Sequence, residues 1–263
     1  HNRTWMKNLK IKKIKNKKKT NKLVCLTAYS KSISRILDNF CDIILVGDSL
    51  ANTLYAMKNT HGVGLNTMIE HGRSVRQGVK KSLLVIDMPK GSYDNLSKAK
   101  KNAKLIMRKT KCDAVKIEHN KNNYKIVKGL VSANINVMGH IGFTPQFKKK
   151  FKVEGKTKKQ KIQLINQALD IEKAGAFSIV LECVDASLAK KITKILKIPT
   201  IGIGSSNNCD GQILVTDDLL GLSGFYPRFV KRYANLNKVI EKAVSNFKKE
   251  VQLEKFPKIK NSY

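Results

Sequence analysis

Short apolar runs alternate with amphipathic stretches along most of the chain. Eight runs have the length and apolar character of strands, at residues 23–28, 42–47, 83–87, 113–118, 135–140, 177–183, 199–204 and 212–215. Between several of them, apolar residues recur every three or four positions, which predicts helices at residues 67–80, 96–109, 158–174 and 186–196. This alternation predicts a parallel sheet built from βα units.

Eight such units within 263 residues match the size of a (β/α)8 barrel, so we expect an α/β protein with a single TIM-barrel domain. The barrel is expected to span residues 23–263. A basic segment at residues 1–22 precedes it and is expected to be partly flexible or packed within an oligomer. A doubly wound open sheet is the alternative, because strand order cannot be read from one sequence.

The charge balance is strongly basic. Lys and Arg number 52 against 19 Asp and Glu, giving a formal net charge of +33, which usually indicates an anionic partner. Only seven of the 52 are Arg, however, and nucleic-acid readers favour Arg for bidentate contacts. We therefore expect no specific nucleic-acid partner. A basic nucleic-acid-binding protein is the alternative, and it predicts an affinity that falls log-linearly with salt.

The spacing of the cysteines and the hydropathy of the chain indicate the cellular compartment of the protein. The five cysteines are far apart and form no CxxC pair, so neither a disulfide framework nor a zinc site is indicated. No apolar run has the length of a signal sequence core near the N-terminus or of a membrane span elsewhere. These features predict a cytoplasmic protein that does not contact a membrane.

Polar residues end most of the predicted strands. In a barrel the carboxyl ends of the strands form the active site, so these residues are the candidates for chemistry. In chain order they are Asp48, Ser49, Asp87, Lys116, Glu118, His140 and Glu182.

Three of these strand ends carry carboxylates, at Asp48, Asp87 and Glu118. A carboxylate at the end of an apolar strand is costly to desolvate unless it binds a cation or a hydrogen-bond donor. Oxygen ligands without cysteine favour a hard ion such as Mg²⁺. Each carboxylate alone could be a helix cap or an ion-pair partner, as for Asp48 before a new helix. Their shared position on consecutive strands favours the metal.

The remaining candidates allow more than one interpretation. Lys116 lies two residues before Glu118 and therefore faces the same side, where it either forms a structural ion pair or binds a substrate carboxylate. Glu182 follows an apolar run, and burial would raise its pKa and make it a usable base; the alternative is a capping or paired glutamate. His140 is either a site residue or a hydrogen-bonded core histidine.

Several motifs resemble those of the ketopantoate hydroxymethyltransferase family, in the family's order, from about residue 23 to residue 233. The most specific are VGDS at residues 46–49, GHIGFTPQ at 139–146 and CDGQILV at 209–215. The others are LTAYSKSISRILD, VIDMPKGSY, AVKIEH, FKVEGKT, IVLECV and PRFVKRY.

The resemblance implies a (β/α)8 barrel related to phosphoenolpyruvate mutase and isocitrate lyase. It implies an enzyme that transfers a hydroxymethyl group from 5,10-methylenetetrahydrofolate to 3-methyl-2-oxobutanoate, forming ketopantoate for pantothenate and coenzyme A synthesis. A divalent metal, expected to be Mg²⁺, and a homo-oligomer, often a decamer in the family, are implied as well.

The resemblance also assigns roles to the strand-end residues. The metal would be bound by Asp48 and Asp87, with Glu118 completing its shell directly or through water. The keto acid would contact Asp48, Ser49, Asp87 and Lys116. Glu182 would be the base that forms a Mg²⁺-stabilised enolate, and His140 would assist at the hydroxymethyl end.

The nearest alternative is another Mg²⁺-dependent lyase or mutase of 2-oxo acids from the same superfamily. Those enzymes often use a reactive cysteine in a loop after the fourth strand, whereas Cys112 here precedes that strand. Departures from the family pattern occur at residues 60–64, Glu70, Lys90 and residues 148–150, where lysines replace a usual glycine pair. They leave the proposed ligands and base intact and concern loops expected to shape the folate pocket.

Overall fold

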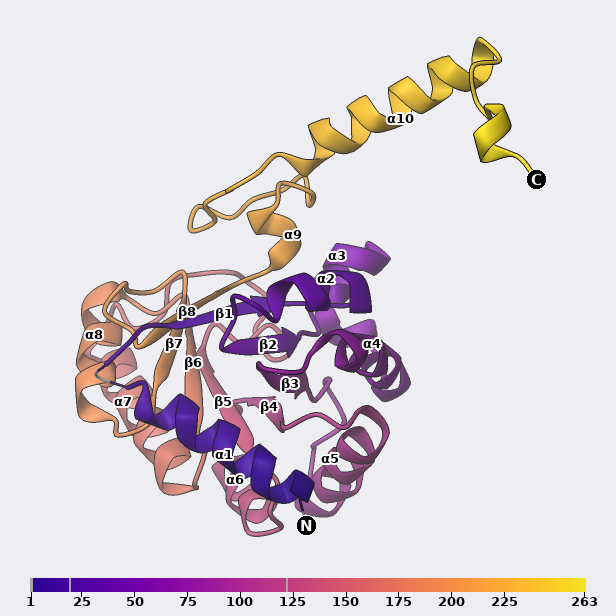
Figure 1. Ribbon diagram of the computed structural model, residues 1–263. Helices are drawn as coiled ribbons and strands as arrows, with labels where there is room; N and C mark the ends of the chain where they lie inside the picture. The colour runs from indigo at the N-terminus through magenta and orange to yellow at the C-terminus, as the bar shows by residue number, and fades with distance from the viewer. Residues whose placement is uncertain (1, 19, 122) are drawn as a thin grey trace. The chain divides into compact units, whose positions relative to one another are not determined.

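The computed structural model describes residues 2–18, 20–121 and 123–263. Its core is a closed barrel of eight parallel strands in which each strand pairs with its neighbours in chain order, and the last pairs with the first (Figure 1). The strands are β1 Leu23–Thr27, β2 Ile43–Val46, β3 Leu83–Asp87, β4 Ala114–Glu118, β5 Val137–Gly142, β6 Ser178–Glu182, β7 Thr200–Ile203 and β8 Gly211–Leu214. The predicted TIM barrel is confirmed.

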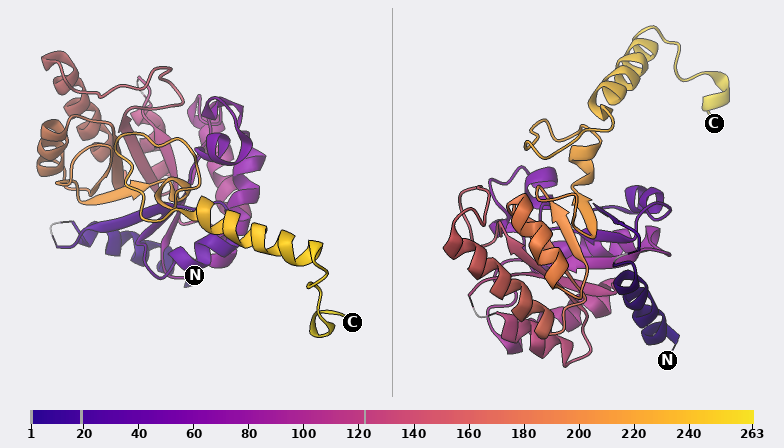
Figure 2. Two further views of the ribbon diagram at one scale, coloured as in Figure 1. Left: turned by 90° about the horizontal axis from the view of Figure 1, so that it is seen from above. Right: turned by 90° about the vertical axis from the view of Figure 1, so that its left-hand side faces the viewer.

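Helices follow the strands around the barrel (Figure 2). The four predicted helices are confirmed, with ends shifted by no more than two residues. The α-helices are α1 Asn2–Asn16, α2 Lys31–Leu37, α3 Leu50–Tyr55, α4 Leu65–Gly78, α5 Leu96–Thr110, α6 Tyr124–Val131, α7 Lys158–Lys173, α8 Ala186–Ile195, α9 Thr216–Leu219 and α10 Leu236–Gln252. Short 3-10 helices are η1 Thr60–Gly62 and η2 Ile259–Asn261.

The side chains of each strand point alternately into the barrel and toward the surrounding helices, so the barrel domain has two apolar cores. In β3, Leu83 and Val85 belong to the apolar cluster inside the barrel, whereas Leu84 and Ile86 belong to the cluster between strands and helices. Both faces are therefore buried, which explains the continuous apolar run in the sequence. The next inward position after Val85 is Asp87, so the barrel interior changes from apolar to polar at the carboxyl ends of its strands.

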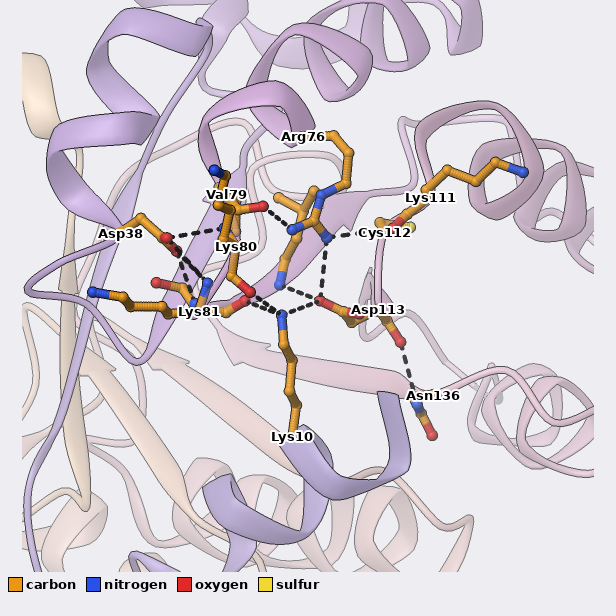
Figure 3. Close-up of polar contacts among 12 residues, drawn as sticks. Lys10, Asp38, Arg76, Val79, Lys80, Lys81, Lys111, Cys112, Asp113 and Asn136 are labelled. Carbon is orange, nitrogen blue, oxygen red and sulfur yellow. Dashed lines mark hydrogen bonds and ion pairs between the residues drawn. The ribbon is translucent and has the colours of Figure 1, made fainter. Parts of the chain in front are cut away.

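Helix α1 lies against the amino-terminal ends of the strands. Its Ile14 is buried in the cluster inside the barrel. Lys10 Nζ donates to the Ser82 carbonyl at 2.9 Å and lies 3.7 Å from Asp113 Oδ2, which Arg76 approaches to 3.6 Å (Figure 3). The basic N-terminal segment thus closes the base of the barrel with both apolar and ionic contacts.

Three lysines of this segment pair with three aspartates, each directly before a strand. The pairs are Lys10–Asp113 before β4, Lys17–Asp42 before β2 and Lys18–Asp210 before β8. The Lys18–Asp210 pair is the most buried, with side chains 7% and 11% exposed and a separation of 2.6 Å. The segment therefore contacts strands from distant parts of the barrel.

Residues 216–263 form a second compact unit that contains α9, α10 and η2. Helix α10 exposes a set of apolar side chains that includes Val239, Ile240, Val244 and Phe247. The predicted division of the chain into a basic segment at residues 1–22 and a barrel domain at residues 23–263 stays a prediction. No described helix combines the length and the apolar composition that crossing a lipid bilayer requires.

Candidate active site

The carboxyl ends of β2 to β6 bring six polar side chains together inside the barrel, and we refer to them as the polar cluster. Five of them are no more than 5% exposed, and the sixth, Glu182, has a side chain 18% exposed. Strand register pairs Asp87 with Lys116 and Glu118 with His140. The polar cluster consists of Asp48, Asp87, Lys116, Glu118, His140 and Glu182, all predicted from the sequence.

Lys116 is the buried cation of the polar cluster. Its Nζ lies 2.9 Å from Asp87 Oδ1 and 3.1 Å from His140 Nδ1. Burial by itself would lower the pKa of Lys116, but the neighbouring carboxylates, with Asp87 the strongest, raise it above its usual range. Lys116 therefore stays charged and offers a fixed positive charge to an anionic ligand.

His140 connects Lys116 to Glu182. Burial, and then the charge of Lys116, lower the pKa of His140 well below its usual range, so the ring is neutral. Its Nδ1 can then only accept the hydrogen bond from Lys116, and the proton must sit on Nε2. Nε2 donates to the Phe143 carbonyl at 3.0 Å and lies 3.0 Å from Glu182 Oε2. His140 thus lies between Lys116 and Glu182.

Glu182 ends β6 where the backbone turns sharply. Burial raises the pKa of Glu182 to about 7, and the positive charge of Lys116 partly opposes this rise. The next residue, Cys183, has a φ of 52°, a left-handed conformation that is uncommon for a residue with a side chain and concentrates at functional sites. Gly142 of β5 has a φ of 94°, and a Cβ there would lie 2.2 Å from the Glu182 carbonyl oxygen. Only glycine therefore permits β5 to approach Glu182 this closely.

Gln146 joins the two carboxylates on the other side of the polar cluster. Its Nε2 donates to Asp48 Oδ2 at 2.9 Å, and its backbone N–H donates to Glu118 Oε2 at 3.0 Å. Its Oε1 accepts a hydrogen bond from the Tyr93 hydroxyl. Burial raises the pKa of both Asp48 and Glu118, and the nearest carboxylates add to the effect.

Gln146 and Tyr93 were not among the predicted site residues. Both lie in loops that follow strands, so a search of strand ends does not find them. Each falls inside a motif of the resemblance, GHIGFTPQ for Gln146 and VIDMPKGSY for Tyr93. That membership is the signal that could have identified them.

Ser49 is placed differently from the other predicted residues. Its hydroxyl lies 2.8 Å from the Tyr29 hydroxyl, at the edge of the site. Ser49 is also the N-cap residue of α3, although its side chain makes no capping hydrogen bond. The alternative role of Asp48 as a helix cap is not observed, because its Oδ2 accepts from Gln146 instead.

Both oxygens of the Asp87 carboxylate have a partner in the protein. Asp87 Oδ2 accepts the backbone N–H of Asp48 at 2.9 Å, and Oδ1 pairs with Lys116 Nζ at 2.9 Å. Among residues 2–18, 20–121 and 123–263, no three His, Cys, Asp or Glu side chains are grouped as ligands of one metal ion. Asp48 and Asp87 are a pair of buried carboxylates on neighbouring strand ends, joined by the hydrogen bond from the Asp48 backbone to Asp87 Oδ2.

Replacing Gln146 by leucine is expected to lower the free energy of unfolding by about 1–3 kcal/mol, the usual cost of leaving a buried polar group without its partner. The change removes the side-chain bonds to Asp48 and Tyr93 while retaining the side-chain volume. Chemical denaturation measures the effect. The same replacement at the exposed Gln77 of α4 is the matched control and should change stability by less than about 0.5 kcal/mol. Equal effects at the two positions would contradict this role for Gln146.

Comparison with solved structures shows the same fold in proteins that share little sequence identity with this chain. The chain is similar to 2,3-dimethylmalate lyase, a PEP mutase/isocitrate lyase superfamily member, with a TM-score of 0.63 at 12% identity, covering 94% of this chain and 87% of that one. It is also similar to phosphonopyruvate hydrolase in complex with oxalate and Mg++, with a TM-score of 0.61 at 11% identity, covering 96% and 93%.

Comparison of sequences gives much stronger similarity. The chain is 52% identical over 256 residues to a 3-methyl-2-oxobutanoate hydroxymethyltransferase of Pelagibacter ubique, covering 97% of this chain and 100% of the relative. It is 48% identical over 255 residues to the enzyme of the same name from Thermotoga neapolitana, covering 95% and 94%. The family model of ketopantoate hydroxymethyltransferase matches residues 8–259. The chain therefore belongs to the ketopantoate hydroxymethyltransferase family of enzymes.

Proposed function

We propose that the protein transfers a hydroxymethyl group from 5,10-methylenetetrahydrofolate to 3-methyl-2-oxobutanoate, forming ketopantoate (2-dehydropantoate) for pantothenate and coenzyme A biosynthesis. Membership of the family supports this reaction. The observation that carries the mechanism is the buried series of contacts from Lys116 through His140 to Glu182. It aligns a fixed cation with a base whose pKa lies near neutrality.

The donor set fits a divalent metal. Asp48 and Asp87 are buried carboxylates on neighbouring strand ends, and carboxylate oxygens are the ligand type that a hard divalent ion prefers. Mg²⁺ is usually held by one or two carboxylates together with water and substrate oxygens, so a third protein ligand is not required. Asp48 and Asp87 would hold the metal, with Glu118 contributing directly or through water. When bound, a divalent metal supplies Lewis-acid polarisation of the keto oxygen, which acidifies the C3 proton.

The protein's own residues provide the other parts of the mechanism. Asp48, Ser49, Asp87 and Lys116 contact the keto acid, and Lys116 offsets the charge of its carboxylate. Glu182 removes the C3 proton, because its pKa of about 7 makes it a stronger base than an ordinary carboxylate and still leaves part of it unprotonated near neutral pH. His140 lies against the Glu182 carboxylate and assists at the new hydroxymethyl end.

Proton exchange at C3 of 3-methyl-2-oxobutanoate tests this proposal. In deuterated water, NMR should show exchange that requires Mg²⁺ and stops when the metal is chelated with EDTA. Addition of 5,10-methylenetetrahydrofolate should then give ketopantoate. Exchange without product would indicate a related lyase or mutase of 2-oxo acids. Absence of exchange would refute the catalytic mechanism and return attention to the binding-protein alternative.

The proposal includes a cytoplasmic homo-oligomer. The exposed apolar side chains of α10, among them Val244 and Phe247, support self-association, because such groups are costly to leave in water. Light scattering of the purified protein measures the mass of the particle directly. A particle with the mass of a single chain, 29.6 kDa, would refute this part of the proposal.

A further inference from the structure

A cavity lies outside the polar cluster, between α6 and α7, and we name it the α6–α7 groove. It has a volume of about 700 Å³, within the range of roughly 300–1,000 Å³ typical of small-molecule sites. Its wall includes Gly142 and Thr144, and its other sides come from the loop after β4, the start of α6 and one side of α7 along most of its length. No role has been assigned to it so far.

The groove is bordered by three lysines from three different segments, Lys121, Lys148 and Lys159. The positive charge of Lys148 is already paired, because its Nζ lies 3.1 Å from Glu154 Oε1 and donates to the Gly142 carbonyl at 2.7 Å. Within the described residues, Lys121 and Lys159 form no ion pair. Asp170 is the one acidic residue that lines the groove, so its net charge is positive. A ligand with more than one carboxylate matches this charge.

The remaining lining combines aromatic and amide side chains. Tyr124 and Phe147 provide apolar surface, and Asn166 and Gln163 provide hydrogen-bonding groups. The Nδ1 atom of His119 is buried and has no hydrogen bond from any described residue, which leaves one unmet polar atom at the groove. This lining suits a flat aromatic ring attached to an acidic chain.

The groove is adjacent to the catalytic residues through a short backbone segment. Gly142 and Thr144 flank Phe143, whose carbonyl accepts the hydrogen bond from His140. We propose that the α6–α7 groove binds the p-aminobenzoyl-glutamate tail of the folate cosubstrate, with Lys121 and Lys159 pairing with its glutamate carboxylates. This inference rests on the proposed function, because the one-carbon end of the same molecule must reach the polar cluster.

Binding of the tail alone tests the inference. The probes are p-aminobenzoyl-monoglutamate and p-aminobenzoyl-pentaglutamate, with affinity measured by calorimetry and by inhibition of ketopantoate formation. The unsubstituted protein should bind the pentaglutamate more tightly than the monoglutamate, roughly threefold to tenfold, as expected for a few exposed ion pairs. A protein with Lys121→Ala and Lys159→Ala should lose this preference.

The control removes the same charge elsewhere, with Lys109→Ala and Lys158→Ala, two exposed lysines outside the groove lining. It should retain the preference for the pentaglutamate. The inference is overturned if the protein shows no preference, if the groove variant keeps it, or if the control loses it equally. Exchange of the C3 proton needs no folate, so it tests the proposed function separately from the groove. If exchange occurs but the groove variant keeps its preference for the pentaglutamate, only the groove inference is refuted. If no exchange occurs, the proposed function is refuted.

Discussion

Replacing Glu182 by glutamine is expected to slow exchange of the C3 proton of 3-methyl-2-oxobutanoate by about 10²- to 10⁴-fold, the usual contribution of a general base. Glutamine keeps the size of the side chain and can lie against His140 Nε2 as Glu182 does, so the fold should be retained. Exchange rates in deuterated water and thermal unfolding measure the two effects. Glu70→Gln, on the exposed surface of α4, removes the same charge and is the matched control.

The pH dependence identifies the base independently. Since burial raises the pKa of Glu182 to about 7, the exchange rate should rise as the pH rises through 7 and the carboxylate loses its proton. The residual exchange of the Glu182→Gln protein should lack this inflection. An inflection that persists in the variant would assign it to another group and remove Glu182 from the role of base.

Replacing Lys116 by methionine is expected to lower the free energy of unfolding by about 3–5 kcal/mol, because it leaves buried carboxylates without their cation. The side chains of Lys116 and Asp87 are only 5% and 4% exposed, so water cannot replace the lost charge. Urea denaturation at a fixed protein concentration measures the change. A double replacement with Asp87→Leu should recover part of the loss, since it removes one of the unpaired carboxylates as well.

Lys98→Met provides the matched control for this experiment. Lys98 forms an ion pair with Asp94 at the same 2.9 Å distance, but the two side chains are 48% and 62% exposed. Exposed pairs contribute at most about 1 kcal/mol, so the control should have little effect. A loss below about 1 kcal/mol for Lys116→Met would contradict the dependence of the polar cluster on its buried cation.

The barrel was predictable because its strands are buried on both faces. A run such as residues 83–87 must be apolar at every position except the last, where it reaches the active-site end, and this pattern is visible in the sequence. The fifth strand was placed two residues too early. The structure begins it at Val137 and extends it past His140 to Gly142, because the positive φ of Gly142 lets the strand follow β6 to its end.

The identity of the polar cluster was also predictable, but its connections were not. Alternation places Lys116 and Glu118 on one face, and this much follows from spacing alone. The bond from Gln146 to Asp48 joins residues 98 positions apart, and the contact of His140 with Glu182 depends on the approach of two strands. Such contacts depend on loop conformation and strand register, which local sequence patterns do not determine.

The three ionic contacts at the base of the barrel imply an order of events in folding. The first helix leaves the ribosome before any strand, yet its segment pairs with Asp42, Asp113 and Asp210. Lys18 and Asp210 are separated by 192 positions, so the segment cannot complete its contacts until nearly the whole barrel has been synthesised. Loop closure over such a distance is slow compared with local helix formation. The contact of Lys18 with Asp210 therefore requires that the segment before β8 has been synthesised and is in place.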